Sequence, residues 1–389
     1  MHERYAEVII SIQLRLQEGD SLTINTNART MNFARFLAKK AVKVTLLPVT
    51  IVETSLGKVL QTYPIDPEEK NLMRPEITTA VLAHIVDLDE FPYGEDEEWN
   101  EPTFEVRTLA HYGHLADPFF LDRRISIPWA NIPYPGTAWA ADLLGHLVTQ
   151  EEMWNLFGTI MRLSDDWPAT YWAEQANVIT YRQKTINALK RGEITIVGEG
   201  VSIVAHQHEH SSWIGGVFTL PSARQYIPLL PIQALHTAFD ATSVQGVIEV
   251  EIPFTLFGQE VTEATFTIEE GVVIDYSASG GKAALDHYFG VDEGSKRVSA
   301  ISIADSNTIE CRYLTKLSHP HYKKECRSIL HLGGVLVDTL PLGMDDEALQ
   351  GLGQSIAHLD LPLPSDLTLC LRHEDGSESL IIENGSFTL

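Results

Sequence analysis

The sequence predicts an α/β protein, with an N-terminal α/β domain built on a mostly parallel sheet and a C-terminal, strand-rich α+β domain. Two observations lead to this prediction. In the first half of the chain, helical and strand patterns alternate, which is typical of a parallel sheet. From residue 192 onward, short strands and tight turns dominate, so we place the boundary between domains 1–191 and 192–389. A chain of 389 residues with 44% hydrophobic residues is long enough to build two such cores.

The first elements of the N-terminal domain follow from changes in hydrophobic periodicity. Arg4–Gln17 carries an apolar stripe at helical spacing, and this helix is expected to end at Gly19. Ser21–Asn25 has the pattern of a strand, and a helix is expected over about Thr30–Lys40. The apolar run Val42–Val49 then predicts a second, buried strand.

The rest of the N-terminal domain is expected to add one more strand and several helices. Thr79–Val86 predicts the strand, and Thr137 is placed to cap a helix that begins at Ala138. The acidic run Glu95–Glu101 predicts a solvated loop without chemistry, because adjacent carboxylates on a flexible loop point in different directions. Further helices are expected at Pro67–Arg74, Glu151–Leu163 and Ala169–Arg191.

The C-terminal domain is predicted to consist largely of hairpins. Gly198-Glu199-Gly200 separates two short apolar strands, and Glu270-Gly271 makes a tight turn between two more. After that second hairpin comes a short helix. These strands and the helix are expected at Ile194–Val197, Val201–Val204, Val261–Ile268, Val272–Ile274 and Lys282–Phe289.

The charge of the chain excludes whole classes of partner. Its 28 Lys and Arg residues against 53 Asp and Glu give a formal net charge of -25. A phosphate backbone or an anionic membrane surface would be repelled by this mean field, so we expect no nucleic-acid partner. No apolar run approaches the length of about 18 residues that a membrane-spanning helix needs.

Cysteine usage indicates the compartment. The three cysteines show no CxxC spacing, so they are expected to be buried thiols in a reducing compartment and not a disulfide framework or a zinc site. We therefore expect a cytoplasmic protein. The three are Cys311, Cys326 and Cys370.

Several stretches resemble the M29 family of metal-dependent aminopeptidases. Ile132–Ala140 reads IPYPGTAWA, close to the family pattern V-P-Y-P-T-P-A-W-A, and Asp292–Ala300 reads DEGSKRVSA where the family has D-E-G-A-R-R-L-G-E. Trp213–Gly216 and Leu220–Tyr226 are similar to the family patterns W-x-G-G and L-P-T-E-E-V-F. The resemblance covers essentially the whole chain. It implies the M29 fold, a peptide-sized groove between the domains and a homodimer.

Where the resemblance implies metal ligands, this alignment places other residues. The last glutamate of D-E-G-A-R-R-L-G-E falls at Ala300, and the two carboxylates of L-P-T-E-E-V-F fall at Ala223 and Arg224, which cannot coordinate a divalent metal. The family pattern D-E-N-A-A-x-H has no histidine in register after Val335–Leu340, and the terminal H-x-D-F-M-I-G fits best at Leu367–Leu371. This alignment predicts that the metal site is lost and that no cofactor is bound.

A displaced metal site is the alternative. His206, His208 and His210 alternate in HQHEH, so on a strand their rings would share one face at a spacing of about 7 Å, which zinc bridges only with a ligand from another element. The other interpretation of HQHEH is a polar, exposed strand end. Candidates to complete such a ligand set are His236, His319, His321, His358 and His373.

Two hypotheses about function follow from the resemblance. The main one is a protein that binds a peptide or peptide-like ligand between its domains without hydrolysing it, through Arg224, Tyr226 and Trp213. The charge of Arg224 would then be neutralised by Asp240, by Glu293 or by the ligand itself. The alternative is an active metal-dependent aminopeptidase, or a related metalloenzyme, that uses displaced ligands with zinc or another divalent metal.

Overall fold

The structure is a computed structural model, and it describes residues 1–55, 58–65, 81–89, 127–308, 327–334, 339–341, 352, 355 and 357–389. The chain forms two compact units. The first takes its described residues from Met1–Pro92, Pro118–Asn177 and Gly216–Ile232, and the second from Val178–Gly215 and Gln233–Leu389. The single boundary predicted at 191/192 lies inside the second unit, and as a statement about separately folding domains it stays a prediction. The predicted helix Pro67–Arg74 and the acidic run Glu95–Glu101 lie outside the described residues.

The first unit is organised around a sheet of five strands in the order β3-β2-β1-β4-β5. β1 pairs in parallel with β2 and β4, β4 pairs in parallel with β5, and β3 joins β2 as an antiparallel edge strand. The predicted, largely parallel sheet is thus confirmed. The elements of this unit are α1 (His2–Val8), a π-helical turn (Ile9–Gln13), β1 (Leu22–Thr26), α2 (Met31–Thr45), β2 (Val49–Ser55), β3 (Lys58–Ile65), β4 (Val81–Asp87), β5 (Trp129–Tyr134), α5 (Thr137–Leu144), α6 (Gln150–Ile160), the first part of α7 (Pro168–Ala188), β8 (Phe218–Thr219) and β9 (Gln225–Tyr226).

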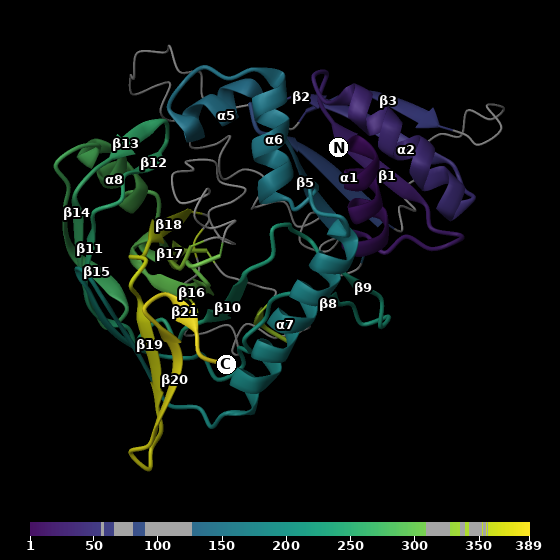
Figure 1. The fold of residues 1–389 in the computed structure, drawn as a ribbon. Coiled ribbons are helices and arrows are strands. Elements are labelled where there is room, and N and C mark those ends of the chain that lie inside the picture. Colours follow the sequence, from purple (N-terminus) through teal and green to yellow (C-terminus); the bar gives the residue numbers. More distant parts are fainter. Residues whose placement is uncertain are drawn as a thin grey trace. The chain divides into compact units, whose positions relative to one another are not determined.

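The strand predicted over Val42–Val49 is wrong, because the helix before it continues further. α2 packs on β1 and β2 and runs to Thr45 (Figure 1). Its buried residues Leu37, Ala41 and Thr45 recur every four positions, which is the spacing of a helix face. Helical periodicity therefore outweighs the apolar run, and β2 begins only at Val49.

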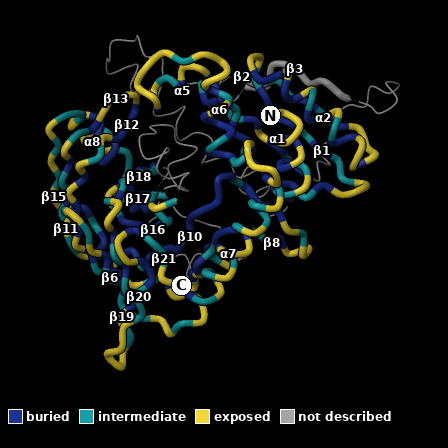
Figure 2. Tube along the Cα trace, viewed as in Figure 1, coloured by how far each residue is buried: buried dark blue, intermediate teal, exposed yellow. Residues whose placement is uncertain are grey.

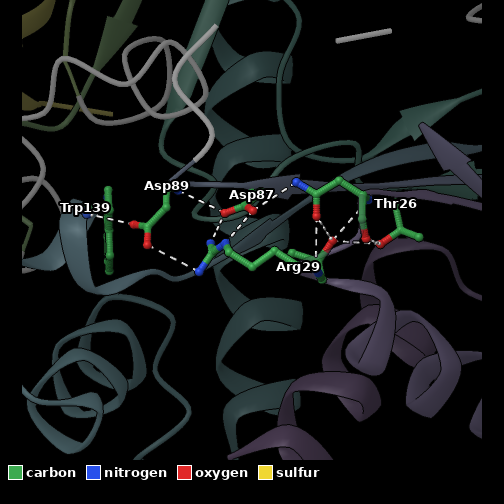
Figure 3. Close-up of polar contacts among 7 residues, drawn as sticks. Thr26, Arg29, Asp87, Asp89 and Trp139 are labelled. Atoms are coloured by element: carbon green, nitrogen blue, oxygen red, sulfur yellow. Dashed lines mark hydrogen bonds and ion pairs between the residues drawn. The ribbon is translucent and has the colours of Figure 1, made fainter. Parts of the chain in front are cut away.

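A polar cluster joins the carboxyl ends of β1 and β4 to the start of α5 (Figure 3). The guanidinium of Arg29 forms ion pairs with Asp87, whose side chain is 3% exposed, and with Asp89. Asn27 donates to Asp87 at 2.9 Å, and the backbone N–H of Trp139 donates to Asp89 Oδ1 at 2.9 Å.

This cluster also replaces the predicted cap of α5. Thr137 is the first residue of the helix, the N-cap position is Gly136, and no side chain at that position makes a cap hydrogen bond. Instead a carboxylate that lies far away in sequence, Asp89, satisfies one of the orphan N–H groups of the first turn. The sequence could not indicate such a long-range cap.

The second unit is built from antiparallel strands, as the sequence predicts. An eight-stranded sheet has the order β15-β14-β11-β7-β6-β19-β20-β21, and a four-stranded sheet has the order β10-β16-β17-β18. The elements are the rest of α7, β6 (Glu193–Gly198), β7 (Val201–His206), β10 (Ala234–Ala238), β11 (Gln245–Val250), β12 (Phe254–Leu256), β13 (Gln259–Val261), β14 (Ala264–Glu269), β15 (Val272–Ser277), α8 (Lys282–Phe289), a 3-10 turn (Glu293–Lys296), β16 (Val298–Ala304), β17 (Ile329–Gly333), β18 (His358–Pro362), β19 (Thr368–Arg372), β20 (Glu378–Glu383) and β21 (Ser386–Phe387).

The core of the second unit lies between its two large sheets and α8. Apolar residues from β6, β11, β14, β16, β17, β18 and β19 join one cluster with Leu285 and Tyr288 of α8. Every residue of β16 and β17 is buried, so these strands are drawn in dark blue in Figure 2. Polar side chains on β16 and β17 are therefore held away from water. Among the helices of the described residues, none is long and apolar enough to cross a membrane.

The turn between β14 and β15 requires glycine for two separate reasons. Gly271 has φ +73, and a Cβ atom there would overlap the carbonyl oxygen of Ala241. Its N–H donates to Val244 O at 2.7 Å, and its carbonyl accepts from Val298 N at 2.9 Å. The turn therefore ties the hairpin to β16 through a backbone that has no room for a side chain.

We predict that Gly271→Ala destabilises the protein well beyond the cost of its backbone angle alone. Gly376→Ala is the matched control, since Gly376 has φ +81 but open space around its Cβ position. The control should cost about 1–2 kcal/mol for the left-handed conformation. Gly271→Ala should cost roughly a further 1–3 kcal/mol for the overlap. Urea denaturation of both variants measures the difference, and equal losses would contradict this account of the turn.

Candidate metal centre

The four-stranded sheet of the second unit brings three metal-ligating side chains together. Antiparallel pairing of β17 with β18 places His331 opposite Asp360 and Gly333 opposite His358. Because side chains alternate along a strand, His331, His358 and Asp360 project from the same face of the sheet. Among the described residues, they are the one group of three whose ligand atoms all lie within 4.8 Å of one another.

The carboxylate of Asp360 lies between the two rings. Its Oδ1 atom is 2.6 Å from Nδ1 of His331 and 2.7 Å from Nε2 of His358. The two imidazoles are stacked, with ring centroids 5.3 Å apart. His331 is fully buried, while the side chains of His358 and Asp360 are 16% and 15% exposed. Solvent therefore does not reach the group at His331 but reaches it partly at His358 and Asp360.

Glycines at the end of β17 make room for His358. Gly333 has φ +63 and Gly334 has φ +54, which favours residues without a Cβ atom. A Cβ atom on Gly334 would lie 2.9 Å from Nδ1 of His358, so a side chain there would push the ring aside. The same pair of glycines bends the chain out of β17 beside the site.

Further polar side chains extend this group across the sheet. Ser302 of β16 lies 2.5 Å from Nε2 of His331, and His236 of β10 lies 2.7 Å from the same hydroxyl oxygen. Both rings of the ligand group and the ring of His236 are thus held by hydrogen bonds.

The donor set fits a divalent transition metal. Imidazole nitrogen and carboxylate oxygen are ligands that zinc and iron accept, and three protein ligands with an open position are typical of catalytic sites. One carboxylate and two neutral imidazoles leave a bound dication with a net positive charge, which suits a site that must attract a carbonyl or an anion. The expectation of a chain without any metal site is therefore not favoured by the described residues.

The HQHEH histidines are placed differently from this group. His206 ends β7 and is exposed, His208 is buried after the strand, and His210 is exposed. The rings of His208 and His210 lie 5.6 Å apart, and the backbone N–H of His210 donates to Nδ1 of His208 at 3.3 Å. His319 and His321 lie outside the described residues. Of the other candidate histidines, His236 and His358 belong to the new group, and His373 bonds Ser379 at 3.0 Å.

The three predicted peptide-binding residues lie in apolar or paired surroundings. Trp213 belongs to the second unit and is 3% exposed, while Tyr226 of β9 belongs to the first unit, is 1% exposed and contacts Trp129. Arg224, also in the first unit, pairs with Asp20 at 2.6 Å and donates to the carbonyl of Arg15 at 2.8 Å. Their contact with a peptide stays a prediction.

The acid predicted to neutralise Arg224 is not the one found beside it. The sequence suggested Asp240 or Glu293, but Asp20 accepts from both terminal nitrogens of the guanidinium, at 2.6 and 3.3 Å. Asp240 instead accepts from the backbone and hydroxyl of Thr242. A partner 204 residues away carries no local sequence signal.

The terminal family motif has a second possible placement in this chain. The predicted placement of H-x-D-F-M-I-G, Leu367–Leu371, ends in β19 and contains neither a histidine nor an aspartate. An H-x-D pattern is present earlier, as His358-Leu359-Asp360 on β18, where it joins His331. The H-x-D spacing could have indicated two of the three residues, but not His331. Ala300, where the resemblance implies a glutamate ligand, lies opposite His331 in the pairing of β16 with β17.

Comparisons with known proteins agree with this fold. A family profile described as thermophilic metalloprotease (M29) matches residues 1–387. Aminopeptidase 2 of Geobacillus stearothermophilus is 21% identical, over 99% of this chain and 97% of its own. The solved structure of wild-type AmpT from Thermus thermophilus superposes with a TM-score of 0.81 at 18% identity, covering 100% of this chain and 99% of that one. The 2,5-dihydroxypyridine dioxygenase of Pseudomonas putida KT2440 superposes with a TM-score of 0.50 at 11% identity, covering 100% and 96%.

We predict that the protein binds zinc through the β17–β18 group and not through HQHEH. Asp360→Ala should weaken zinc binding by more than about 100-fold, since even outer partners of a ligand are worth about 10–100-fold. The control is the double variant His206→Ala/His210→Ala, which changes two exposed residues and should bind zinc as the wild type does. Titration against a chelator measures both. Wild-type zinc affinity in Asp360→Ala together with weakened zinc binding in the double variant would instead support the HQHEH site.

We also predict that Arg224 acts mainly on stability. Arg224→Ala should cost about 1–3 kcal/mol, because it removes charge-assisted hydrogen bonds from a side chain that is 15% exposed. Asp20→Ala should cost a similar amount, and the double variant less than the sum of the two. Urea denaturation tests this cycle. An unchanged stability together with a weaker affinity for a peptide pool would instead support the peptide contact.

Proposed function

Because the chain belongs to the thermophilic metalloprotease family M29, we propose that it is a metal-dependent aminopeptidase whose ion is held by His331, His358 and Asp360. The observation that carries this proposal is the convergence of two imidazoles and a carboxylate on one face of β17 and β18. It supports the alternative of the sequence analysis, an active metalloenzyme, over a binding protein without a metal. The ligands are not the HQHEH histidines, however.

The chain's own residues have distinct tasks in this proposal. A bound divalent cation supplies Lewis acidity toward a peptide carbonyl and lowers the pKa of water. Asp360 contributes the one negative charge of the ligand group, and His331 supplies a rigid donor because it is fully buried. His358, at the partly exposed side, lies where a substrate can approach from solvent.

Among the described residues, the ligand group offers donors for one ion and not two. The residue opposite His331 on β16 is Ala300, so this neighbouring position offers a methyl group where a carboxylate could have bridged a second ion. The other position at which the resemblance implies carboxylates is occupied by Ala223 and Arg224, and Arg224 is paired with Asp20. We therefore propose one equivalent of metal per chain.

The remaining parts of the proposal come from the resemblance and from the composition. The substrate is a peptide or peptide-like molecule, and the protein is a cytoplasmic homodimer. The net charge of -25 supports a partner other than nucleic acid.

A second candidate function is an Fe(II)-dependent oxygenase. Two histidines and one carboxylate with open positions are the ligand set of non-haem Fe(II) oxygenases. The likeness to the 2,5-dihydroxypyridine dioxygenase concerns the fold alone, so the donor set carries this candidate. The two candidates differ in the metal that they require and in whether oxygen is consumed.

One experiment separates these functions. Metal-free protein is loaded with zinc, cobalt, manganese or anaerobic Fe(II), and each form is assayed for release of amino-terminal residues from a peptide pool. We expect release with at least one metal, and Asp360→Ala should lower the rate by about 100-fold, or about 2.7 kcal/mol. Asp275→Ala, which changes an exposed carboxylate on β15 of the same unit, is the control and should leave the rate unchanged.

The contrary outcomes are also informative. Oxygen uptake by the Fe(II) form with 2,5-dihydroxypyridine, without peptide cleavage, would replace the aminopeptidase by the oxygenase. Peptide binding without turnover in any metal form would support the hypothesis of a protein that binds peptides without hydrolysing them.

A further inference from the structure

Five polar side chains form one hydrogen-bonded row across the four-stranded sheet. In spatial order they come from β10, β16, β17 and β18, and the neighbouring members are joined at 2.7, 2.5, 2.6 and 2.7 Å. The strand register accounts for this row, because His236 lies opposite Ser302 and His331 lies opposite Asp360. The row is His236, Ser302, His331, Asp360 and His358.

The position of Ser302 decides which nitrogen of His331 faces the ligand group. Nδ1 of His331 lies beside Asp360, while Nε2 lies beside the Ser302 hydroxyl. For Nδ1 to bind a cation, the ring proton must sit on Nε2 and needs an acceptor there. Both Ser302 and His331 are fully buried, so the hydroxyl oxygen of Ser302, and not bulk water, is placed to accept that proton.

His236, in the tautomer with an unprotonated Nδ1, offers an acceptor that orients the Ser302 hydroxyl. A serine that donates its own proton to Nδ1 of His236, 2.7 Å away, keeps its lone pairs for the N–H of His331. The backbone of His236 is fixed by two hydrogen bonds to Ile214, both between 2.8 and 2.9 Å. The acceptor for the serine proton therefore does not depend on the ion.

We propose that Ser302, oriented by His236, is a positioning residue that presents Nδ1 of His331 to the metal ion. This rests on the proposed ion at His331, His358 and Asp360, but not on whether the reaction is hydrolysis or oxygenation. Without Ser302, the Nε2–H of the buried His331 ring loses the hydroxyl oxygen that lies 2.5 Å away. That loss weakens the ligand as well as its orientation.

The test measures zinc affinity by competition with a chelator in full-length variants. Ser302→Ala should bind zinc about 10–100-fold more weakly than the wild type. Ser299→Ala is the matched control: this serine is also buried on β16, but its hydroxyl donates to the backbone carbonyl of His331 at 3.2 Å and not to the ring. It should change the affinity by less than about threefold. Ser302→Thr, which keeps the hydroxyl, should restore most of the lost affinity.

A spectroscopic readout separates positioning from a general structural effect. In zinc-loaded wild type, ¹⁵N NMR of the histidine rings should show a hydrogen-bonded, slowly exchanging Nε2–H on His331. In Ser302→Ala this signal should be lost, and in Ser299→Ala it should remain. His236→Ala should broaden the signal and weaken zinc binding by less than about tenfold, since the serine keeps its oxygen but loses its fixed direction.

The failures of the two proposals are distinguishable. Equal zinc affinity in Ser302→Ala and Ser299→Ala, or an unchanged Nε2–H signal in Ser302→Ala, overturns the role of Ser302 while leaving the ion site in place. A wild-type protein that binds no zinc, cobalt or Fe(II) overturns the proposed function, and the positioning role with it.

Discussion

The register between β17 and β18 is the constraint on which the candidate site depends. A slip of one residue would move every side chain of a strand to the opposite face, so His331 and Asp360 would no longer meet. The register is fixed by the other face of the same strands, where Leu330, Leu332, Leu359 and Leu361 join the buried core. The hydrophobic pattern that sets the register of this sheet thus also brings the three candidate ligands together.

Local patterns predicted most of the elements but not their long-range partners. Hydrophobic periodicity located the parallel strands β1 and β4, the hairpins and α8, whose bounds Lys282–Phe289 are those predicted. It failed at the end of α2, where a short apolar run has the composition of a buried strand but the spacing of a helix. It also could not show that Asp89 caps α5, because that carboxylate lies 50 residues away.

Two of the three candidate metal ligands share a local sequence pattern, although the terminal family motif is predicted at another segment. His358 and Asp360 have H-x-D spacing, yet Leu361 and Pro362 follow them, and the apolar segment Leu367–Leu371 fits the family pattern better by hydrophobicity alone. His331 carries no local signal at all, because its link to Asp360 arises from strand pairing 29 residues apart. Arg224, at a position where the family pattern has a carboxylate, forms an ion pair with Asp20, and no local sequence signal indicates that partner.

Two polar clusters among the described residues call for different explanations. The cluster of Arg29, Asp87 and Asp89 joins the carboxyl ends of β1 and β4 to the first turn of α5, a helix that no strand pairing ties to them, so its contribution to the architecture is sufficient reason for it. The row from His236 to His358 lies on adjacent strands that backbone hydrogen bonds already hold together. Apolar side chains at these positions would keep the same strand pairing. They would also avoid the free-energy cost of desolvating polar groups, which for buried ion pairs often exceeds the electrostatic attraction gained. Architecture therefore gives no reason for the row. The proposed cation does, because its ligands need hydrogen bonds from neighbouring side chains that fix the orientation of their donor atoms.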